Sequence, residues 1–434
     1  RRYGMTNPLF IYPPKPGLLM KFFPAWLKWL LPPVLLAALC LYAAWLFLPK
    51  GSGAGAMLAA LAHPSAADLS LDQRVVLAVR LPRILTALLV GAVTAVSGLL
   101  LQTMTRNPLA SPSLLSINAG AGLGIIFTGV FLTSAAAGDF SLTVTPAGVN
   151  ATALLLAAAV FALGLFFAWN SWRAHERSLV ALAIAALCTV AGLAALLFFL
   201  HRPASAVVPA QAVQHFLRGT RLSAAAAIGG ALSWSLVMFI SYSGGRLQQN
   251  RLILAGIAVS AFCVALGRAA LLLDETQASS VMRWLAGSLE NITWAQWHQF
   301  WPWVLLPVLP LLWLLPKLNL LRLSDEAAQS LGLSVRQLRG MVNVIVLAWV
   351  GTAVAITGPI AFIGLLVPHL AKFWIGYDLR LAVPMSALLG ALLLVAADVL
   401  AIHLAYPAKL PAGAVLAIIG APCFVLLAKR RSDT

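Results

Sequence analysis

Charged residues are scarce in this sequence, and acidic residues are the scarcest. Only 9% of the 434 residues are charged, with 12 Asp and Glu against 29 Lys and Arg. Hydrophobic residues make up 61%, and the mean hydropathy is +0.93. Because so few polar side chains cannot cover the outside of a soluble domain, the composition excludes a soluble globular protein. It predicts that lipid surrounds most of the chain.

Residue groups that carry metal or covalent chemistry are also missing. Each of the four cysteines lies inside an apolar run without a CxxC or Cys/His spacing, as expected of small buried residues: Cys40, Cys188, Cys263 and Cys423. The 12 acidic residues and 7 histidines form no catalytic cluster in the sequence, and there is no GxxxxGK[ST] phosphate loop. We therefore expect a protein that is not an enzyme, binds no metal or cofactor, and has no ATP site of its own.

Basic residues give the chain a formal net charge of +17. They lie in short loops between apolar runs, which is typical of loops that face an anionic membrane surface and argues against a nucleic-acid partner. Their distribution predicts that both termini are cytoplasmic, with residues 1–23 as a cytoplasmic segment and Met5 or Met20 as the natural start. The first apolar run is too long for a cleaved signal and indicates a retained helix.

Apolar runs long enough to cross a bilayer recur along the sequence. A spanning helix needs about 20 mostly apolar residues. About twelve stretches qualify, with predicted bounds 24–48, 84–104, 112–134, 144–170, 179–200, 222–243, 252–273, 298–316, 340–357, 358–375, 384–404 and 412–428. The sequence thus predicts an all-α, polytopic membrane protein with a single transmembrane domain over residues 24–434.

One candidate pore or helix-break segment follows the second apolar run. Gln102 is a polar residue inside that run, and Asn107 and Pro108 then interrupt it. Broken backbone at membrane depth is tolerated only where protein or a water-filled cavity satisfies its polar groups. Tight helix packing is the competing explanation for the small residues nearby.

A second candidate segment lies later in the chain. Gly358-Pro359 ends one apolar run, and Pro368-His369 lies inside the next. His369 could be a proton or metal ligand, but no His, Cys or carboxylate lies at helical spacing from it. Asp398, an acid within the membrane, is a candidate for function or for a structural hydrogen bond.

A short polar stretch, residues 324–339, separates two apolar runs. Its pattern predicts a helix with Asp325 and Glu326 in the first turn, where acids are favoured, and Gly332 at its end. A second helical turn is predicted from Ser334. The stretch is too short to be a domain and too polar to enter lipid, so it is expected at the cytoplasmic face.

Several motifs appear together in a fixed order. They are RLPR (80–83), NPLA (107–110), GAG (120–122), RLILAG (251–256), WLAGS (284–288), LGL (331–333), the run 358–369, LPAG (410–413) and GAP (420–422). In this order they resemble the FecCD-type permeases, which are the membrane subunits of ABC importers for iron-siderophores, haem and vitamin B12. The resemblance extends from about residue 24 to the end of the chain.

The resemblance implies an ATP-driven importer in the bacterial cytoplasmic membrane. Two permease chains, expected as a homodimer, would enclose a pore, and separate ATPase subunits would hold ATP and Mg²⁺ on the cytoplasmic side. A periplasmic or lipid-anchored binding protein would deliver an iron-siderophore, haem or corrinoid, which then crosses by alternating access. A secondary ion- or proton-coupled transporter is the competing hypothesis, although such carriers need midplane coupling sites and no carboxylate pair is apparent.

The resemblance also assigns candidate site residues. The coupling helix that contacts the ATPase would be residues 324–339, with contacts from Asp325, Glu326, Ala327, Ala328, Leu331, Gly332, Leu333 and Arg336. The binding protein would dock on Arg80, Arg83 and Lys409. The cytoplasmic gate would comprise Gln248, Gln249 and Asn250. Each assignment has a competing explanation. The coupling helix could be a solvated inner loop, the docking residues could anchor the chain at the outer headgroups, and the gate could be a plain polar loop.

One departure from the family pattern is large. The family normally has ten membrane helices, whereas this chain is predicted to contain an extra helix pair, inserted or duplicated, at about residues 140–215. Residues 178–221 and 251–291 share an order of apolar helix, polar loop and Phe/Trp-Leu-x-Gly-Ser/Thr turn. This likeness indicates either a duplicated helix pair or a similarity of composition.

Overall fold

The computed structural model describes residues 25–45, 76–127, 210–243, 246–271, 284–290, 292–322, 325–405 and 410–432. Its α-helices are α1 Ala25–Trp45, α4 Leu81–Thr105, α5 Ile117–Phe127, α9 Ala210–Ser241, α10 Gln249–Leu271, α12 Trp294–Leu305, α13 Val308–Leu318, α14 Asp325–Ser330, α15 Val335–Thr357, α16 Ile363–Ile375, α17 Leu379–Ala405 and α18 Ala412–Ser432. The remaining elements are the π-helix η2 Val76–Arg80, the 3₁₀-helix η4 Asn319–Arg322, and the antiparallel strand pair β1 Tyr242–Ser243 and β2 Arg246–Leu247.

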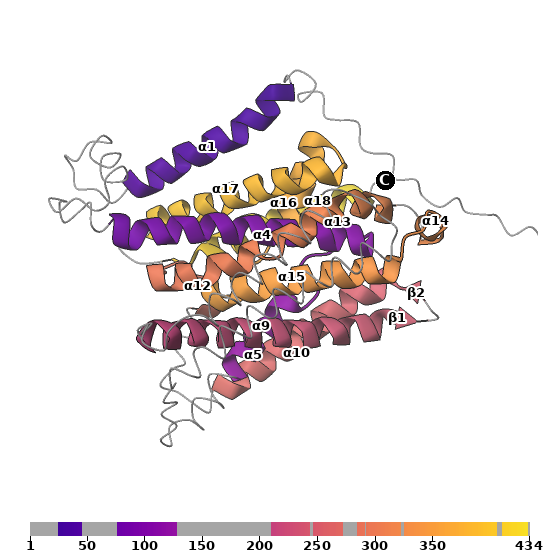
Figure 1. Ribbon diagram of the computed structural model, residues 1–434, viewed down its shortest axis with the longest axis horizontal. Coiled ribbons are helices and arrows are strands. Elements are labelled where there is room, and N and C mark those ends of the chain that lie inside the picture. The colour runs from indigo at the N-terminus through magenta and orange to yellow at the C-terminus, as the bar shows by residue number, and fades with distance from the viewer. Residues whose placement is uncertain are drawn as a thin grey trace, which may run out of the picture.

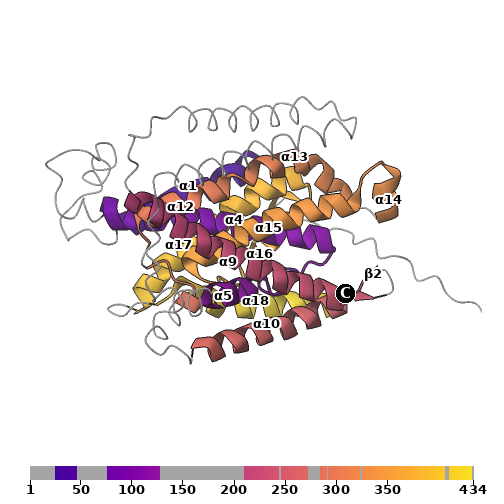
Figure 2. The same cartoon turned by 60° about the horizontal axis from the view of Figure 1, so that its bottom comes forward.

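The long helices lie side by side along one axis (Figures 1 and 2). α4 is at the centre and packs against α15, α16 and α17. Small residues allow this close packing: a Cβ atom on Gly98 would collide with the backbone of Gly364 on α16. α4 is consequently buried along most of its length.

Most of the predicted spans coincide with helices. Among the residues that the structure describes, five helices are long and apolar enough to cross a membrane, and five shorter apolar helices accompany them. These ten correspond to ten of the twelve predicted stretches. The other two, 144–170 and 179–200, lie outside the described residues, as do most of the predicted insertion and residues 1–23.

Several predicted boundaries are wrong, and turn chemistry explains three of them. α5 begins at Ile117, not at 112, because residues 111–116 form a hydrogen-bonded turn. α16 begins at Ile363 because residues 358–362 are not helical. The predicted helix at 298–316 is interrupted between α12 and α13, next to Pro307, which lacks the amide donor that a continuous helix needs.

The suggested repeat does not extend to its shared turn. Residues 284–288 form a turn, but the corresponding residues 216–220 lie inside the continuous helix α9, which begins 12 residues before the predicted span at 222. The Phe-Leu-Arg-Gly-Thr sequence was therefore wrongly predicted as a turn. Whether the pattern comes from a duplicated helix pair or from similar composition stays open, because most of the first copy lies outside the described residues.

Polar contacts gather helix ends at two opposite ends of the molecule. At one end Arg106, after α4, contacts Asp325 at the start of α14, and Asn319 contacts Asp378 before α17. At the other end the indole of Trp294 donates to the carbonyl of Leu77 (2.8 Å). The α14 end carries the loops predicted to be cytoplasmic; which side of a membrane it faces stays a prediction.

Candidate coupling site and outer rim

α14 forms a short projection at one end of the bundle (Figure 1). Asp325 and Glu326 occupy its first turn, where they complement the helix dipole. Gly332 follows with a left-handed backbone, at φ +82°, and its amide donates to the carbonyl of Gln329 (2.8 Å). The amide of Leu333 donates to the carbonyl of Ala328 (3.2 Å), so the helix ends in a closed, hydrogen-bonded turn.

The predicted coupling residues divide into two groups by exposure. Glu326, Gly332 and Arg336 are exposed, and the side chain of Leu331 is 62% exposed. An apolar side chain in this position is available to a partner. The second predicted turn, which carries Arg336, is the first turn of α15 and not a separate element.

The other predicted coupling residues face their own chain. Ala328 is completely buried, Leu333 packs against the hydrophobic core, and Ala327 is half-buried. Of the predicted contact surface, Leu331 and Gly332 therefore offer most to a partner. Ala328 and Leu333 hold α14 and its following turn to the bundle.

Asp325, which was predicted to contact a partner, has contacts within its own chain; a partner contact stays a prediction. Oδ1 accepts hydrogen bonds from Arg106 and from Arg339 of α15, the latter at 2.9 Å. Arg106 also donates from Nε to the carbonyl of Leu321 in η4 (3.1 Å). The sequence contained no signal for these pairs beyond the small number of acidic residues near many arginines in loops predicted to be cytoplasmic.

A neighbouring set of contacts joins η4 to the start of α17. Asn319 donates to Asp378 (2.8 Å), and the backbone amide of Arg380 donates to the same carboxylate (3.0 Å). These two hydrogen bonds, the backbone one first, hold the pKa of Asp378 below its usual range. Arg322 donates to the carbonyl of Tyr377 (3.2 Å). The carboxylate is therefore a fixed link between two helix ends.

The first helix-break segment is a compact turn. Asn107 is buried, and its side-chain oxygen accepts from the amide of Leu109 (3.0 Å) across Pro108. Gln102 is also buried; it donates to the carbonyl of Leu365 (3.3 Å) and accepts from Lys372 (2.7 Å). These side chains satisfy the interrupted backbone and tie α4 to α16, and their predicted place in a pore stays a prediction.

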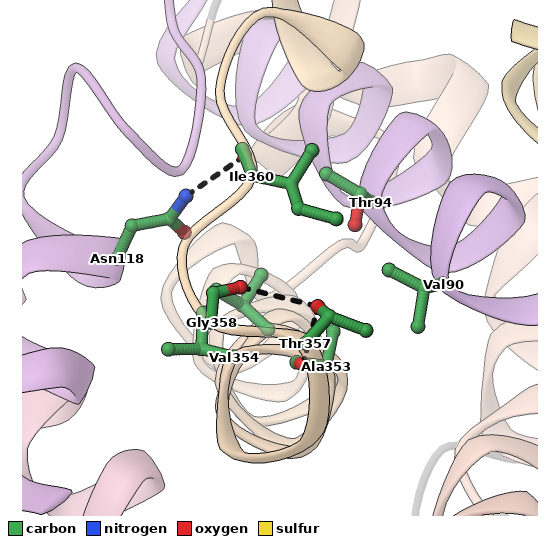
Figure 3. Close-up of a pocket in the computed structure, with 9 residues that line it drawn as sticks. Val90, Thr94, Asn118, Ala353, Val354, Thr357, Gly358 and Ile360 are labelled. Atoms are coloured by element: carbon green, nitrogen blue, oxygen red, sulfur yellow. Dashed lines mark hydrogen bonds between the residues drawn. The ribbon is translucent and has the colours of Figure 1, made fainter. Parts of the chain in front are cut away.

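The second helix-break segment borders a small pocket between α4, α5 and α15 (Figure 3). Gly358 has φ +73°, and Thr357 donates to its carbonyl (3.1 Å). After Pro359 the chain passes between α4 and α5, where Asn118 donates to the carbonyl of Ile360 (3.1 Å). An α5 side chain thus satisfies backbone that the proline leaves outside a helix.

Pro368 and His369 lie within α16, which continues through both residues. Pro368 is buried, and Nδ1 of His369 donates to the carbonyl of Leu365 (2.7 Å). Among the described residues, no group of three or more His, Cys, Asp and Glu could hold a metal ion.

The end of the bundle opposite α14, predicted to face outward and called the outer rim below, contains an ion pair that the sequence did not predict. Arg83, at the start of α4, contacts Asp398 of α17 through two hydrogen bonds, from Nε (2.9 Å) and from a terminal nitrogen (2.7 Å). Their side chains are only 14% and 9% exposed. Arg80 is the last residue of η2, directly before α4. Lys409 lies outside the described residues. Asp398 therefore neutralises one of the arginines predicted to dock a binding protein.

The candidate gate lies at the strand turn before α10. Gln248 and Asn250 are exposed, and the amide of Gln248 donates to the carbonyl of Ser241 (3.2 Å). Gln249 is the first residue of α10. The turn and the helix start fix the backbone of all three residues, whereas their role as a gate is untested.

Proteins of known family match this chain over most of its length. The FecCD transport family matches residues 35–219 and 184–430. The chain belongs to the FecCD transport family. The two matched segments overlap at residues 184–219, which is where the sequence analysis predicts additional helices.

Relatives of the FecCD chain include permeases with named substrates. It is 41% identical to the Fe(3+) dicitrate transport system permease protein FecC of Escherichia coli (strain K12), over 83% of this chain and 85% of that protein. It is 32% identical to the Fe(3+)-citrate import system permease protein YfmD of Bacillus subtilis (strain 168), with 84% of each chain covered. The hemin permease HmuU of Yersinia pestis is 31% identical, over 82% of this chain and 83% of its own.

A solved structure shares the fold. It is described as an inward-facing conformation of a metal-chelate type ABC transporter, and it matches with a TM-score of 0.59 at 24% identity, covering 92% of this chain and 98% of the other. This FecCD protein is thus a multi-pass permease of the bacterial inner membrane and a transport subunit. The family implies ATPase and substrate-binding partners.

Proposed function

We propose that this chain is the membrane-spanning subunit of an ATP-driven importer for a ferric chelate of the citrate type. The observation that carries the substrate class is the 41% identity to a ferric dicitrate permease over 83% of the chain. Two relatives from Bacillus subtilis, at 32% and 30% identity, are also named for ferric citrate. The chelate would come from a binding protein at the outer face and cross between two copies of the permease as they open to each side in turn.

The exposed turn that follows α14 supports an ATPase partner. Leu331 is 62% exposed beside the exposed Gly332 at the end predicted to be cytoplasmic. An exposed apolar side chain on a hydrogen-bonded turn is available to pack against a second protein. The sequence lacks a phosphate loop, so in an ATP-driven importer the energy would enter through such a contact.

Outer docking in this proposal relies on the arginines of the rim. Rim charges steer encounter and fix register more than they add affinity. Arg80, Arg83 and Lys409 stay the proposed contacts for acidic residues of the binding protein, and the pairing of Arg83 with Asp398 fixes the position of one of them. Gln248 and Asn250, both exposed, remain the proposed cytoplasmic gate.

The substrate is tested by deleting the gene in its own bacterium and measuring uptake of labelled chelates. Cells are given ⁵⁵Fe-citrate, a ⁵⁵Fe-hydroxamate siderophore, haem and ⁵⁷Co-cobalamin under iron limitation. Loss of ⁵⁵Fe-citrate uptake alone, restored by the gene on a plasmid, is the expected result. Unchanged ⁵⁵Fe-citrate uptake with loss of another compound would reassign the substrate, and no loss at all would contradict an import role.

The ATPase contact is tested with one residue in two variants. Leu331→Glu places a charge on the apolar contact and should abolish co-purification with the ATPase. Leu331→Met keeps an apolar side chain of similar volume and should retain the ATPase. Retention in both variants would place the contact elsewhere on the chain.

The competing secondary transporter requires a titratable or ion-binding group that is free to change partners. Asp398, the acid predicted within the membrane, is held by Arg83 through two hydrogen bonds. No comparison favours that class. Uptake that persists after removal of every ATPase able to bind the chain would revive it.

A further inference from the structure

α14 is joined to the bundle at few places. It packs mainly against η4 and α15, and it projects beyond the ends of the long helices (Figure 1). Ala328, fully buried, is its apolar attachment. Asp325, the first residue of the helix, is its polar attachment. If α14 moves, the movement can reach the rest of the bundle through Asp325, through Ala328 or through the backbone on either side of the helix.

Asp325 binds two long helices through a single oxygen atom. Oδ1 accepts from Arg106, which follows α4, and from Arg339 of α15 at 2.9 Å. The same Arg106 donates to the carbonyl of Leu321 (3.1 Å), four residues before Asp325. The guanidinium of Arg106 therefore contacts both Leu321 and Asp325, which flank the residues leading into α14. The carboxylate of Asp325 in turn links the start of α14 to the end of α4 and to α15.

Arg106 is the left-handed C-cap of α4, a common way for a helix to end. Its φ is +50°, a left-handed conformation that bulky residues rarely adopt. Such residues persist where the surroundings determine them, and here the amide donates to the carbonyl of Thr103 while the side chain holds Asp325 and Leu321. The turn aims the guanidinium at α14.

The ion pairs contribute little to stability. The side chains of Arg106, Arg339 and Asp325 are 35%, 32% and 40% exposed, and pairs this exposed are screened by solvent. Their importance is that they connect α14 to particular helices. α4 has 25 residues, which is about 37 Å of helix, and it runs from Arg106 to the outer rim at Arg83.

We propose that Asp325 is a positioning residue for energy coupling, which makes α4 and α15 follow α14 when the ATPase moves it. The inference rests on the proposed function, because it takes the exposed turn that follows α14 as the ATPase contact. It differs from that function in assigning Asp325 an inward role within the permease. Because α4 spans the molecule, a shift at Arg106 is carried to the opposite end.

The test uses the transporter purified with the ATPase that accompanies the wild-type chain, reconstituted in vesicles with its binding protein. ⁵⁵Fe-citrate uptake and ATP hydrolysis are measured in the same vesicles. Asp325→Asn keeps the shape of the side chain and removes its charge. Asp378→Asn is the matched control, since it makes the same chemical change at the same end of the molecule on a residue that contacts η4 and the start of α17 and not α14.

The expected result is that Asp325→Asn retains the ATPase and hydrolyses ATP, while uptake per ATP falls at least about fivefold, the lower range of energetic coupling between sites. Arg339→Gln should act in the same direction, and it serves as the test if the Asn variant fails to accumulate. Asp325→Glu should restore part of the ratio, and Asp378→Asn should leave it unchanged.

Two results would overturn the proposal. If Asp325→Asn loses the ATPase during purification, the carboxylate is a partner contact; if its uptake per ATP equals that of the wild type, it has no positioning role. Failure of the wild-type vesicles to import ⁵⁵Fe-citrate at the cost of ATP would instead contradict the proposed function, so the two failures are distinguishable.

Discussion

The crossing of α4 and α17 provides a test of how closely these helices pack. Gly91 and Gly390 face each other there, and a Cβ atom added to either would lie 2.3 Å from the carbonyl oxygen of the other. Ordinary van der Waals contact begins near 3.4 Å, so Gly91→Ala requires the two backbones to separate by about 1 Å. No flexible side chain can absorb this change, because the obstructing atoms belong to the backbone.

The energetic cost follows from that separation. A gap of about 1 Å removes roughly half of the dispersion energy of each affected atom pair, and overpacking a well-packed core typically costs about 1–3 kcal/mol. We expect Gly91→Ala to destabilise the protein by about 2 kcal/mol. Gly390→Ala should cost a similar amount, and the double variant should cost less than the sum, because the first methyl group already separates the helices.

Gly340→Ala is the matched control. Gly340 lies within α15, and nothing lies within 4 Å of a Cβ added there. Alanine is favoured over glycine in a helix by up to about 1 kcal/mol, so this variant should be as stable as the wild type or more stable.

Thermal unfolding of the purified protein in one detergent measures all four variants. The midpoint of Gly91→Ala should fall by on the order of 4 °C, while that of Gly340→Ala should not fall. An unchanged midpoint for both Gly91→Ala and Gly390→Ala would refute the close crossing. Strict additivity in the double variant would show that the two glycines do not share a contact.

Three further predictions use the same unfolding assay or uptake. Asp398→Asn should destabilise the protein by about 3 kcal/mol because it leaves Arg83 buried without its counter-ion; replacing both residues with apolar ones of similar volume should cost less, and the reverse order would contradict a buried pair. Gly332 has φ +82° and nothing within 4 Å of an added Cβ atom. Gly332→Ala should therefore lower uptake more than Gly332→Asn, because Asn tolerates a left-handed backbone. Equal losses in the two variants would show that the added side chain disturbs a partner contact and that backbone strain is not the cause. Gly358→Ala should prevent accumulation of folded protein, because the added atom would strike a backbone carbonyl, whereas Gly376→Ala, with open space, should cost only about 1–2 kcal/mol for its left-handed backbone.

Much of the helical framework was predictable from the sequence. Ten apolar stretches coincide with described helices because lipid selects continuous apolar runs, and that selection depends on composition alone. α14 was predictable for a similar reason, since acids at its start and a glycine at its end are local signals. The failures were at α9, where a Gly-containing sequence stayed helical, and at residues 358–362, where a helix was expected.

The candidate site was predictable only as a stretch of chain. The sequence marked Ala328, Leu331 and Leu333 alike as contact residues, whereas packing buries Ala328, partly buries Leu333 and leaves Leu331 62% exposed. Which face of a short helix remains available depends on what the rest of the chain places beneath it. No local pattern contains that information.

The sequence by itself determined that this protein spans a membrane, roughly where its apolar helices lie, and which family it belongs to. Whether a segment prefers lipid or water, and whether it forms a helix, depends mainly on residues that are close together in the chain. The sequence alone is therefore enough to predict both. Only the tertiary structure decided that Asp325 joins Arg106 and that Asp398 joins Arg83, because these partners lie 219 and 315 positions apart. Scarce acids in a basic chain must find counter-ions, and the folding of the helices decides which ones they reach.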